Sequence, residues 1–292
     1  MNRADHRHIL LGALALLLPA TVARACPGVG VIIRIDGKPQ DVVIMRSEGS
    51  GPRAPVARPR VLEVLCGGDT IRAQNGTAVT LSLDGAPTVK VQGPQGAYTV
   101  GARRGGATLA SNAYRNVSDH LLPDMKRQPW DVRLRGPGRE LGFALTTLAS
   151  GLQTLTPGPR NLLVRLDGGV GAYKVAIASD SGAVLAQAAG ATPDVVLPGL
   201  NLAPGAYVIK ATDSSGAAVE AHVAVVADKP PLSADYAGMT DAEVQAAAVA
   251  ADLARDHSDA WSLEAEQVLA SAPVNGLDRE SVYELIESYG PA

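Results

Sequence analysis

The side chains that could perform chemistry are few and widely spaced in this 292-residue chain. Beyond the first 25 residues it has three histidines, His120, His222 and His257, and their spacing matches no metal site. Walker A, G-x-S-x-G, H-E-x-x-H and C-x-x-C sequences, which would announce phosphate binding, a serine nucleophile, zinc or redox chemistry, do not occur. The sequence therefore predicts no metal, no cofactor and no catalytic residue.

Acidic side chains are the remaining candidates for catalysis. Asp167, Asp180 and Asp213 follow apolar runs at turn positions, where aspartate is favoured because it hydrogen-bonds to nearby backbone. No run has the alternating oxygen ligands of a Ca²⁺ loop. Two distant carboxylates could still meet in space, so a hydrolase remains an alternative. A sugar-cleaving cleft is disfavoured, because only 3% of the residues are aromatic.

The two cysteines, Cys26 and Cys66, form an even pair, which in an oxidising compartment predicts a disulfide. It would close a loop of about 40 residues and stabilise the fold by roughly 3–4 kcal/mol. The alternative is a reactive Cys66 thiol with a histidine base. The disulfide is favoured, since no histidine lies near Cys66 in the sequence.

The first 25 residues have the organisation of a secretory signal peptide. A basic segment precedes an apolar core at residues 9–18, and Ala23-Arg24-Ala25 provides a cleavage site. The core is too short to span a bilayer, which needs roughly 20 residues. We expect cleavage after Ala25 and a periplasmic or secreted protein. A lipoprotein anchored at Cys26 is the alternative, although Arg24 fits an acylation signal poorly.

Charge gives little reason to expect a polyanionic partner. The formal net charge is −3, and removing the first 25 residues, with three arginines and one aspartate, makes it −5. Nucleic acids and anionic membranes attract basic surfaces. We therefore expect no nucleic acid partner and no stable membrane span.

The region 26–101 has the pattern of a small β domain. Apolar runs at residues 31–35 and 42–45 flank a turn and predict a hairpin. Asn75-Gly76 is a strong tight-turn signal, and residues 78–83 alternate apolar and polar.

Residues 64–73 and 75–85, VLCGGDTIRA and NGTAVTLSLDG, resemble the FecR-type periplasmic domain. The resemblance covers about 40 residues and implies a β-rich, extracytoplasmic domain that serves signalling or envelope binding. The chain departs from the FecR regulators, which also have a transmembrane helix and a cytoplasmic segment. Direct transmembrane signalling is therefore not expected.

Residues 102–128 read as a linker with one short helix, and residues 129–228 as a second β module. Turn signals every 8–12 residues separate about seven short strands, the pattern of a sandwich. Residues 202–213 read Leu-x-Pro-Gly-x-Tyr-x-Ile-x-Ala-x-Asp and resemble the penultimate strand of bacterial Ig-like modules. That resemblance implies that Tyr207 packs beside the preceding corner.

The region 240–292 has a helical period and predicts about three short helices. Thr240 and Glu243 have the spacing of a capping box, and Asp278 could cap the last helix. Val282, Leu285, Ile286 and Tyr289 share one face of that helix. This face could pack on the protein itself or dock a partner, and packing is favoured.

The sequence thus predicts a mainly β protein with two β-rich modules and a C-terminal helical segment. The function expected is that of an exported, non-enzymatic interaction or adaptor protein, which binds another envelope protein through its β modules and helical tail. The alternative is a module that binds envelope polysaccharide or peptidoglycan, for which a groove lined by Trp130, Tyr98 or Tyr173 would be evidence.

Overall fold

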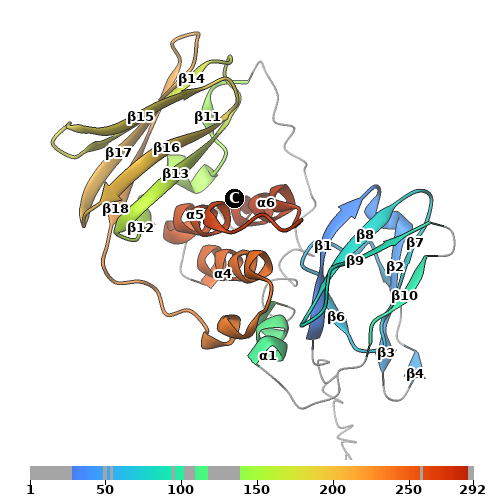
Figure 1. Cartoon of the computed structure of the whole chain (residues 1–292). Helices are drawn as coiled ribbons and strands as arrows, with labels where there is room; N and C mark the ends of the chain where they lie inside the picture. The colour runs from blue at the N-terminus through green and yellow to red at the C-terminus, as the bar shows by residue number, and fades with distance from the viewer. Residues whose placement is uncertain are drawn as a thin grey trace, which may run out of the picture.

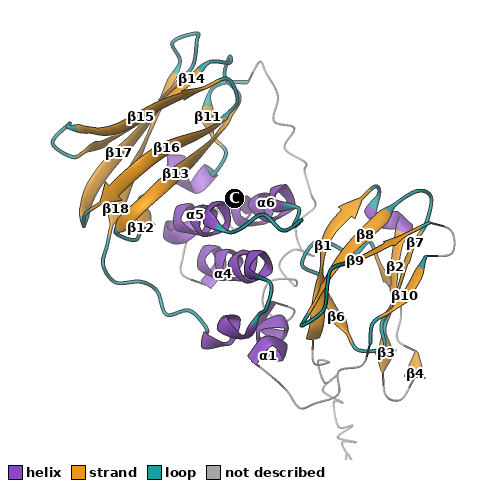
Figure 2. Cartoon of the chain, viewed as in Figure 1, coloured by secondary structure: helices purple, strands orange, loops and turns teal. Residues whose placement is uncertain are grey.

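The computed structural model describes residues 28–48, 51–52, 55–93, 96–101, 109–117, 139–256 and 259–288. The described chain is mainly β, with helices concentrated at the C-terminal end, as the sequence predicts. Two β-sandwiches lie on either side of a central group of helices (Figures 1 and 2). No helix in the described residues is long and apolar enough to cross a membrane. The expected signal peptide lies outside the described residues.

The first sandwich consists of two four-stranded sheets. One has the order β6-β1-β8-β9 and the other β10-β7-β2-β5. Their bounds are β1 (Gly28–Asp36), β2 (Val42–Met45), β5 (Val56–Ala57), β6 (Val64–Cys66), β7 (Thr70–Ala73), β8 (Ala78–Leu83), β9 (Val89–Gln92) and β10 (Ala97–Thr99). A 3₁₀ turn, η1 (Pro39–Asp41), and a small ribbon of β3 (Ser47–Glu48) and β4 (Gly51–Pro52) complete it.

The predicted hairpin between residues 31–35 and 42–45 is wrong. β1 pairs with β6 and β8, whereas β2 pairs with β5 and β7 in the opposite sheet. Residues 28–33 are all buried, so β1 is covered on both faces, and its unbroken apolar run is typical of such a strand rather than of a half-exposed hairpin. Asn75 and Gly76 do form a tight turn, with φ of 52° and 80°, but it joins β7 and β8 of different sheets.

The second sandwich contains a three-stranded sheet of order β11-β13-β16 and a five-stranded sheet of order β12-β18-β17-β14-β15. Their bounds are β11 (Gly142–Phe143), β12 (Gln153–Leu155), β13 (Gly158–Asp167), β14 (Tyr173–Ser179), β15 (Val184–Gly190), β16 (Asp194–Leu202), β17 (Gly205–Thr212) and β18 (Ala218–Val225). A short helix that the sequence pattern does not predict, α3 (Thr146–Ser150), connects β11 to β12.

Tyr207 of β17 occupies the place that the Ig-like resemblance implies. Its side chain is buried, and its hydroxyl donates a hydrogen bond to the carbonyl oxygen of Ala203 at 2.8 Å. This contact ties the strand to the corner that precedes it, in the manner of a tyrosine corner.

The helices fill the space between the sandwiches (Figure 1). They are α1 (Leu109–Asn116), η3 (Ala234–Gly238), α4 (Ala242–Asp256), η4 (Asp259–Trp261), α5 (Ser262–Ser271) and α6 (Arg279–Ser288). One continuous apolar cluster runs from Val31 and Ile33 on the outer face of β1, through Leu285 of α6, to Leu166 and Ile209 of the second sandwich. A separate cluster fills the first sandwich. The helices therefore brace both β units.

The start of α4 differs from the predicted capping box. Asp241, not Thr240, caps the helix, because its Oδ1 accepts hydrogen bonds from the backbone N–H groups of Glu243 and Val244 at 3.0 and 3.2 Å. Thr240 instead donates its hydroxyl to Asp84 of the β8–β9 turn. The second Asp241 oxygen accepts from Ser82 of β8 at 2.8 Å, so this helix end is fixed to the first sandwich.

Candidate functional site

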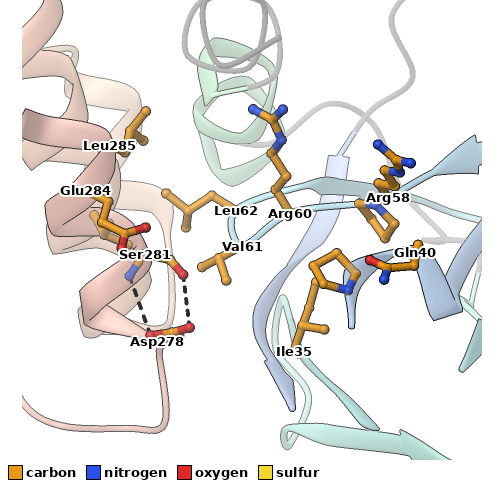
Figure 3. A pocket seen from close by; sticks show the side chains of 13 residues that line it. Ile35, Gln40, Arg58, Arg60, Val61, Leu62, Asp278, Ser281, Glu284 and Leu285 are labelled. Atoms are coloured by element: carbon orange, nitrogen blue, oxygen red, sulfur yellow. Dashed lines mark hydrogen bonds between the residues drawn. The ribbon is translucent and has the colours of Figure 1, made fainter. Parts of the chain in front are cut away.

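A pocket of about 370 Å³ lies where α6 faces the first sandwich. One wall comes from the end of β1, η1 and the segment 58–62, and the other from α6 (Figure 3). The lining residues are Ile35, Pro39, Gln40, Arg58, Pro59, Arg60, Val61, Leu62, Asp278, Ser281, Val282, Glu284 and Leu285. A concave site that joins an apolar surface to a few polar groups is the usual form of a ligand or anchor site.

The pocket is divided by charge. Arg58 and Arg60 lie on the sandwich wall, while Asp278 and Glu284 lie on the α6 wall (Figure 3). Burial lowers the pKa of Arg60, and the nearby Glu63 carboxylate partly opposes that shift. Between the charged groups the lining is apolar and includes the largely buried side chains of Val61, Leu62 and Leu285. The site therefore offers an apolar surface with cations on one side and carboxylates on the other.

The sandwich wall contains strained backbone. Arg58 and Leu62 have φ of 62° and 67°, and they are two of the four non-glycine residues with positive φ in the described chain. A bulky, buried residue such as Leu62 rarely adopts this conformation. Its N–H donates to the carbonyl oxygen of Ile32 at 2.7 Å, which holds the segment against β1. Strain of this kind is concentrated at ligand clamps and switch regions.

At a bulge in β1, a backbone hydrogen bond joins the first sandwich to the start of α6. The register with β8 shifts between Ile32 and Arg34, and the carbonyl oxygen of Ile33 accepts a hydrogen bond from the N–H of Asp278 at 2.8 Å. Asp278 also caps α6, since its Oδ1 accepts from the backbone N–H of Ser281 at 3.5 Å, and its Oδ2 accepts from the Ser281 hydroxyl at 3.0 Å (Figure 3). The first turn of α6 is thereby placed directly beside the sandwich wall.

A buried carboxylate fixes the chain that leads into α6. Glu243 of α4 accepts hydrogen bonds from the N–H groups of Asn275 and Leu277 at 2.7 and 2.9 Å. It also pairs with Arg279 Nε at 2.7 Å, and its side chain is 1% exposed. All these interactions serve the structure, so this carboxylate is not available to act on a ligand.

Arg165 of β13 ties α6 to the second sandwich. Its buried guanidinium contacts both carboxylate oxygens of Glu280 at 2.7 Å, Glu287 at 3.0 Å, and the ring of Tyr283 at 4.1 Å from the centroid. Burial opposes the charged form of Arg165, but Glu287, Glu266 and Glu280 outweigh it and raise the arginine pKa. Burial, together with Glu266, raises the pKa of Tyr283 to about 12.

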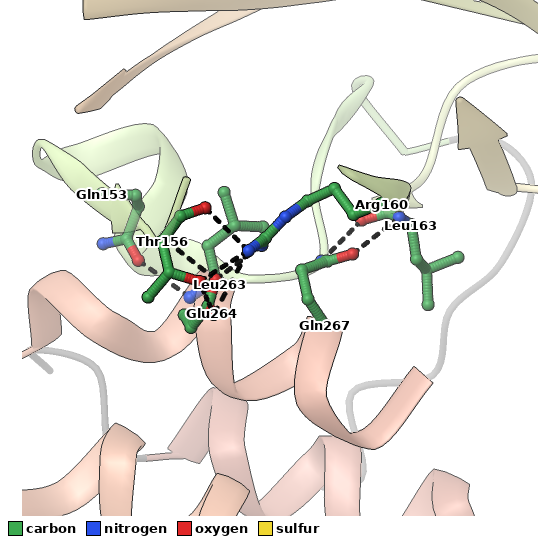
Figure 4. A network of polar contacts seen from close by, with 7 residues as sticks. All are labelled: Gln153, Thr156, Arg160, Leu163, Leu263, Glu264 and Gln267. Atoms are coloured by element: carbon green, nitrogen blue, oxygen red, sulfur yellow. Dashed lines mark hydrogen bonds and ion pairs between the residues drawn. The ribbon is translucent and has the colours of Figure 1, made fainter. Parts of the chain in front are cut away.

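A second polar seam joins α5 to the same sandwich (Figure 4). Glu264 accepts from Thr156 Oγ1 and Arg160 Nη1, both at 2.6 Å. The amide of Gln267 accepts from the N–H of Leu163 at 2.8 Å and donates to its carbonyl oxygen at 3.0 Å. It thus satisfies the edge of β13 that faces the helices. These contacts fix α5 against the second sandwich.

The structure describes only one of the two cysteines that are predicted to form a disulfide. Cys66 is buried in β6, and its N–H donates to Asp69 Oδ2 at 2.8 Å. Cys26 lies outside the described residues, so the pairing stays a prediction. Asp69, from the Gly-Asp of the FecR-like stretch, is fully buried and also binds Arg46 at 2.7 Å, so its role in this chain is structural.

The predicted apolar face of the last helix lies largely inside the protein. Val282, Leu285 and Ile286 are at most 2% exposed and belong to the large apolar cluster. Tyr289 lies outside the described residues. Val282 and Leu285 also line the pocket, so part of this face borders the candidate site.

The two tyrosines whose groove would be evidence for a polysaccharide-binding module pack against the protein itself. Tyr173 is buried, with its hydroxyl bonded to the Gly168 carbonyl, and Tyr98 packs against the core of the first sandwich. Trp130, His120 and His257 lie outside the described residues, and His222 is exposed on β18. Within the described ranges, no group of three or more metal-binding side chains comes together.

Sequence reasoning missed the pocket itself. Arg58 and Pro59 fall in a segment whose composition indicates a loop, and the strand that the sequence predicts from Arg60 begins only at Val64. The Arg-Pro-Arg triplet gave no motif to follow. Two apolar stretches, residues 61–62 and one face of α6, could have suggested a contact. The sequence alone does not show that they lie side by side, because only the fold brings them together.

Comparisons with known proteins do not assign a family. No family model and no curated protein matches the chain. Among solved structures, CopC from Methylosinus trichosporium OB3b is 21% identical over 27% of this chain and 88% of its own, with a TM-score of 0.22. The ZIG-8–RIG-5 IG1–IG1 heterodimer is 15% identical over 37% of this chain and 98% of its own, with a TM-score of 0.19.

A third similar structure is SGBP-B of the Bacteroides ovatus mixed-linkage glucan utilization locus, solved in complex with a mixed-linkage heptasaccharide. It is 11% identical over 76% of this chain and 71% of its own, with a TM-score of 0.21. Similarities of this size carry no functional argument.

Proposed function

We propose that the protein is an exported, non-enzymatic adaptor whose pocket beside α6 receives an apolar side chain of another envelope protein. The observation that carries the proposal is the pocket, whose lining joins the nearly buried apolar side chains of Leu62 and Leu285 to charged groups at its sides. Protein interfaces commonly combine a desolvated apolar anchor with a polar rim. The FecR-like stretch fits an envelope-binding role, and it remains part of the proposal.

The buried acids give a reason to favour binding over catalysis. Glu243, Glu264 and Asp69 are buried, and each holds backbone N–H groups or an arginine of the protein itself. A general acid or base needs an oxygen within reach of its substrate. These carboxylates are directed into the structure, and they brace the helices and the first sandwich.

Photo-crosslinking tests the proposal in the native envelope. A photoreactive residue replaces exposed Gln40 at the pocket, and the matched control places it at exposed Lys229, outside the pocket. We expect one envelope protein to be captured from position 40 and not from position 229. The captured protein is then purified and titrated against the adaptor.

The titration tests whether the positive charge on one wall of the pocket and the negative charge on the other contribute to binding. Arg58→Glu should weaken binding by about tenfold or more, because it reverses the charge of the sandwich wall, whereas Lys229→Glu should bind like the native protein. Equal dissociation constants for the two variants, or no capture specific to position 40, would overturn the pocket as the docking site. Pocket-independent co-sedimentation with isolated peptidoglycan would instead support the polysaccharide alternative.

Export is tested separately. We expect the mature protein from its native host to begin at Cys26 and to fractionate with the periplasm. An intact N-terminus at Met1 in the cytoplasmic fraction would contradict this part of the proposal, and a diacylglyceryl group on Cys26 would support the lipoprotein alternative.

A further inference from the structure

The loop between α5 and α6 contains Asn275-Gly276, one of two Asn-Gly pairs in the chain. Both residues are exposed, and Val274 before them is 83% exposed. Gly276 has a φ of 97°, and no residue other than its chain neighbours lies within 4 Å of the position that a Cβ would take. Its N–H has no hydrogen-bond acceptor among the described residues. The backbone nitrogen that follows Asn275 is therefore open to solvent and free to move.

The N–H groups on either side of Gly276 bind one buried oxygen. Asn275 and Leu277 both donate to Oε2 of Glu243, at 2.7 and 2.9 Å, and the Glu243 side chain is 1% exposed. The side chain of Asn275 also donates through Nδ2 to Oδ2 of Asp241, the cap of α4, at 3.3 Å. This one asparagine thus helps to hold the chain that enters α6 against the start of α4.

We propose that Asn275 is a site of spontaneous deamidation, and that the isoaspartate formed there releases the start of α6 from α4. The Gly276 nitrogen gives up its proton and bonds to Cγ of Asn275, and the side-chain amide leaves as ammonia, so that a cyclic succinimide closes. Glycine favours this attack, because no side chain hinders the approach of its nitrogen. Water then adds to one ring carbonyl to give aspartate, or to the other to give isoaspartate, and it is the only co-reactant.

Isoaspartate would act on the two contacts that hold the loop. Its main chain is longer by a methylene between the two N–H groups that share Oε2 of Glu243, so that oxygen cannot keep both at their present distances. A hydrogen bond to a buried carboxylate is then lost. Both products also replace the amide that donates to Asp241 by a carboxylate, which repels it. The strained segment leads directly to Asp278, whose N–H binds the carbonyl oxygen of Ile33 in the first sandwich.

The other pair, Asn75-Gly76, provides an internal comparison. It forms the tight turn between β7 and β8, with φ of 52° and 80°, and the Asn75 amide donates to Asp41 Oδ1 at 2.8 Å. These contacts lie within the first sandwich, so deamidation of Asn75 would leave the helices in place. Release of α6 at Asn275 does not depend on the proposed adaptor function, because it follows from the contacts of the loop alone.

Ageing the full mature protein at mildly alkaline pH, where the attacking nitrogen loses its proton more readily, tests the proposal. A synthetic peptide of residues 271–280, aged beside it, shows that the conditions convert the unconstrained sequence. Peptide mapping by mass spectrometry locates deamidation, and methylation by an isoaspartate methyltransferase measures isoaspartate. We expect isoaspartate at position 275 and a melting temperature lower by about 2–4 °C or more. Hydrogen exchange at the N–H of Leu277 should become faster by about tenfold or more, since its acceptor is lost.

Two variants assign the effect to one site. Asn275→Gln keeps the amide but would have to close a larger ring, which forms much more slowly, so its melting temperature should not change on ageing. Asn75→Gln should age like the native protein. Intact Asn275 under conditions that convert the peptide would overturn the modification, and native melting of the protein with isoaspartate at position 275 would overturn the release of α6. A loss of stability that persists in Asn275→Gln, or disappears in Asn75→Gln, would contradict the assigned site.

Discussion

At the scale of single residues, buried polar groups were the least predictable part of the chain. Glu243 suggested a capping box, yet its carboxylate binds residues 275–279, more than 30 positions away. Asp241 caps the helix instead. A local motif states only which hydrogen bonds are possible nearby, and a tertiary partner can replace them. Tyr207 was easier to place, because its hydroxyl partner, Ala203, lies four residues away.

Tyr207 allows packing and hydrogen bonding to be separated. Tyr207→Ala should destabilise the protein by about 3–5 kcal/mol, since it removes a buried aromatic ring. Tyr207→Phe keeps the ring and should cost only about 0.5–1.5 kcal/mol, the value of one hydrogen bond. Urea unfolding of the three proteins measures both differences. An effect of Tyr207→Ala below about 0.5 kcal/mol would show that the side chain is not in the core.

The raised pKa of Tyr283 predicts that the protein loses stability as the pH becomes alkaline. Its pKa is raised to about 12 in the folded protein, from an ordinary value of 10.0. The folded state therefore holds the phenolic proton more tightly, so the stabilisation is fully present below pH 10 and is lost as the pH rises towards 12. The loss should approach about 3 kcal/mol, because each pKa unit corresponds to about 1.4 kcal/mol.

Denaturant unfolding at a series of alkaline pH values measures that loss. Tyr283→Phe has no phenolic proton and should lack this part of the pH dependence, although other groups still titrate. Ultraviolet absorbance of the tyrosinate should show one tyrosine titrating late in the native protein and not in the variant. Identical pH profiles for the two proteins would mean that Tyr283 does not experience the environment of Glu266 and Arg165 described above.

At the scale of elements, the sequence was informative where a pattern is local. Three C-terminal helices form as predicted, and the first and last begin close to the candidate caps Thr240 and Asp278, because periodicity and capping residues act within a few turns. Which strands pair with one another was harder to predict from the sequence. The apolar run of residues 28–33 shows that β1 is buried, but only the fold shows that Val31 and Ile33 face the helices. The pocket depends on that non-local contact and so could not be predicted.

The seam between α5 and β13 can be tested by one side chain. Gln267→Ala leaves the N–H and C=O of Leu163 without their partner and should destabilise the protein by about 1–3 kcal/mol. Gln267→Glu keeps the acceptor for the N–H but cannot donate to the carbonyl oxygen, so it should also destabilise. Thermal and denaturant unfolding measure both variants. Native stability in Gln267→Ala would show that water replaces the amide at this edge.

At the scale of the whole molecule, the helices decide whether the two β units behave as one. The large apolar cluster contains residues of β1, of every α-helix from α4 to α6, and of the second sandwich. Polar contacts reinforce it at both ends, through Ser82 to Asp241 on one side and Arg165 to Glu280 on the other. Unfolding the helices would expose the outer face of β1 and the helix-facing edge of β13 together. We therefore expect one cooperative unfolding transition.

Ile286 is the position from which this coupling can be broken. Its side chain is fully buried in α6, within the shared cluster, so Ile286→Asp should destabilise the full-length protein by more than about 2 kcal/mol by burying an unpaired charge. Truncation after Lys229 should lower the melting temperature and increase binding of a hydrophobic dye. Calorimetry should then show the first sandwich melting separately, since its inner core is a cluster of its own. Unchanged melting of the Ile286→Asp protein would mean that α6 does not brace the β units. The helical segment would then be a separate docking element, because a face this apolar needs a partner to cover it.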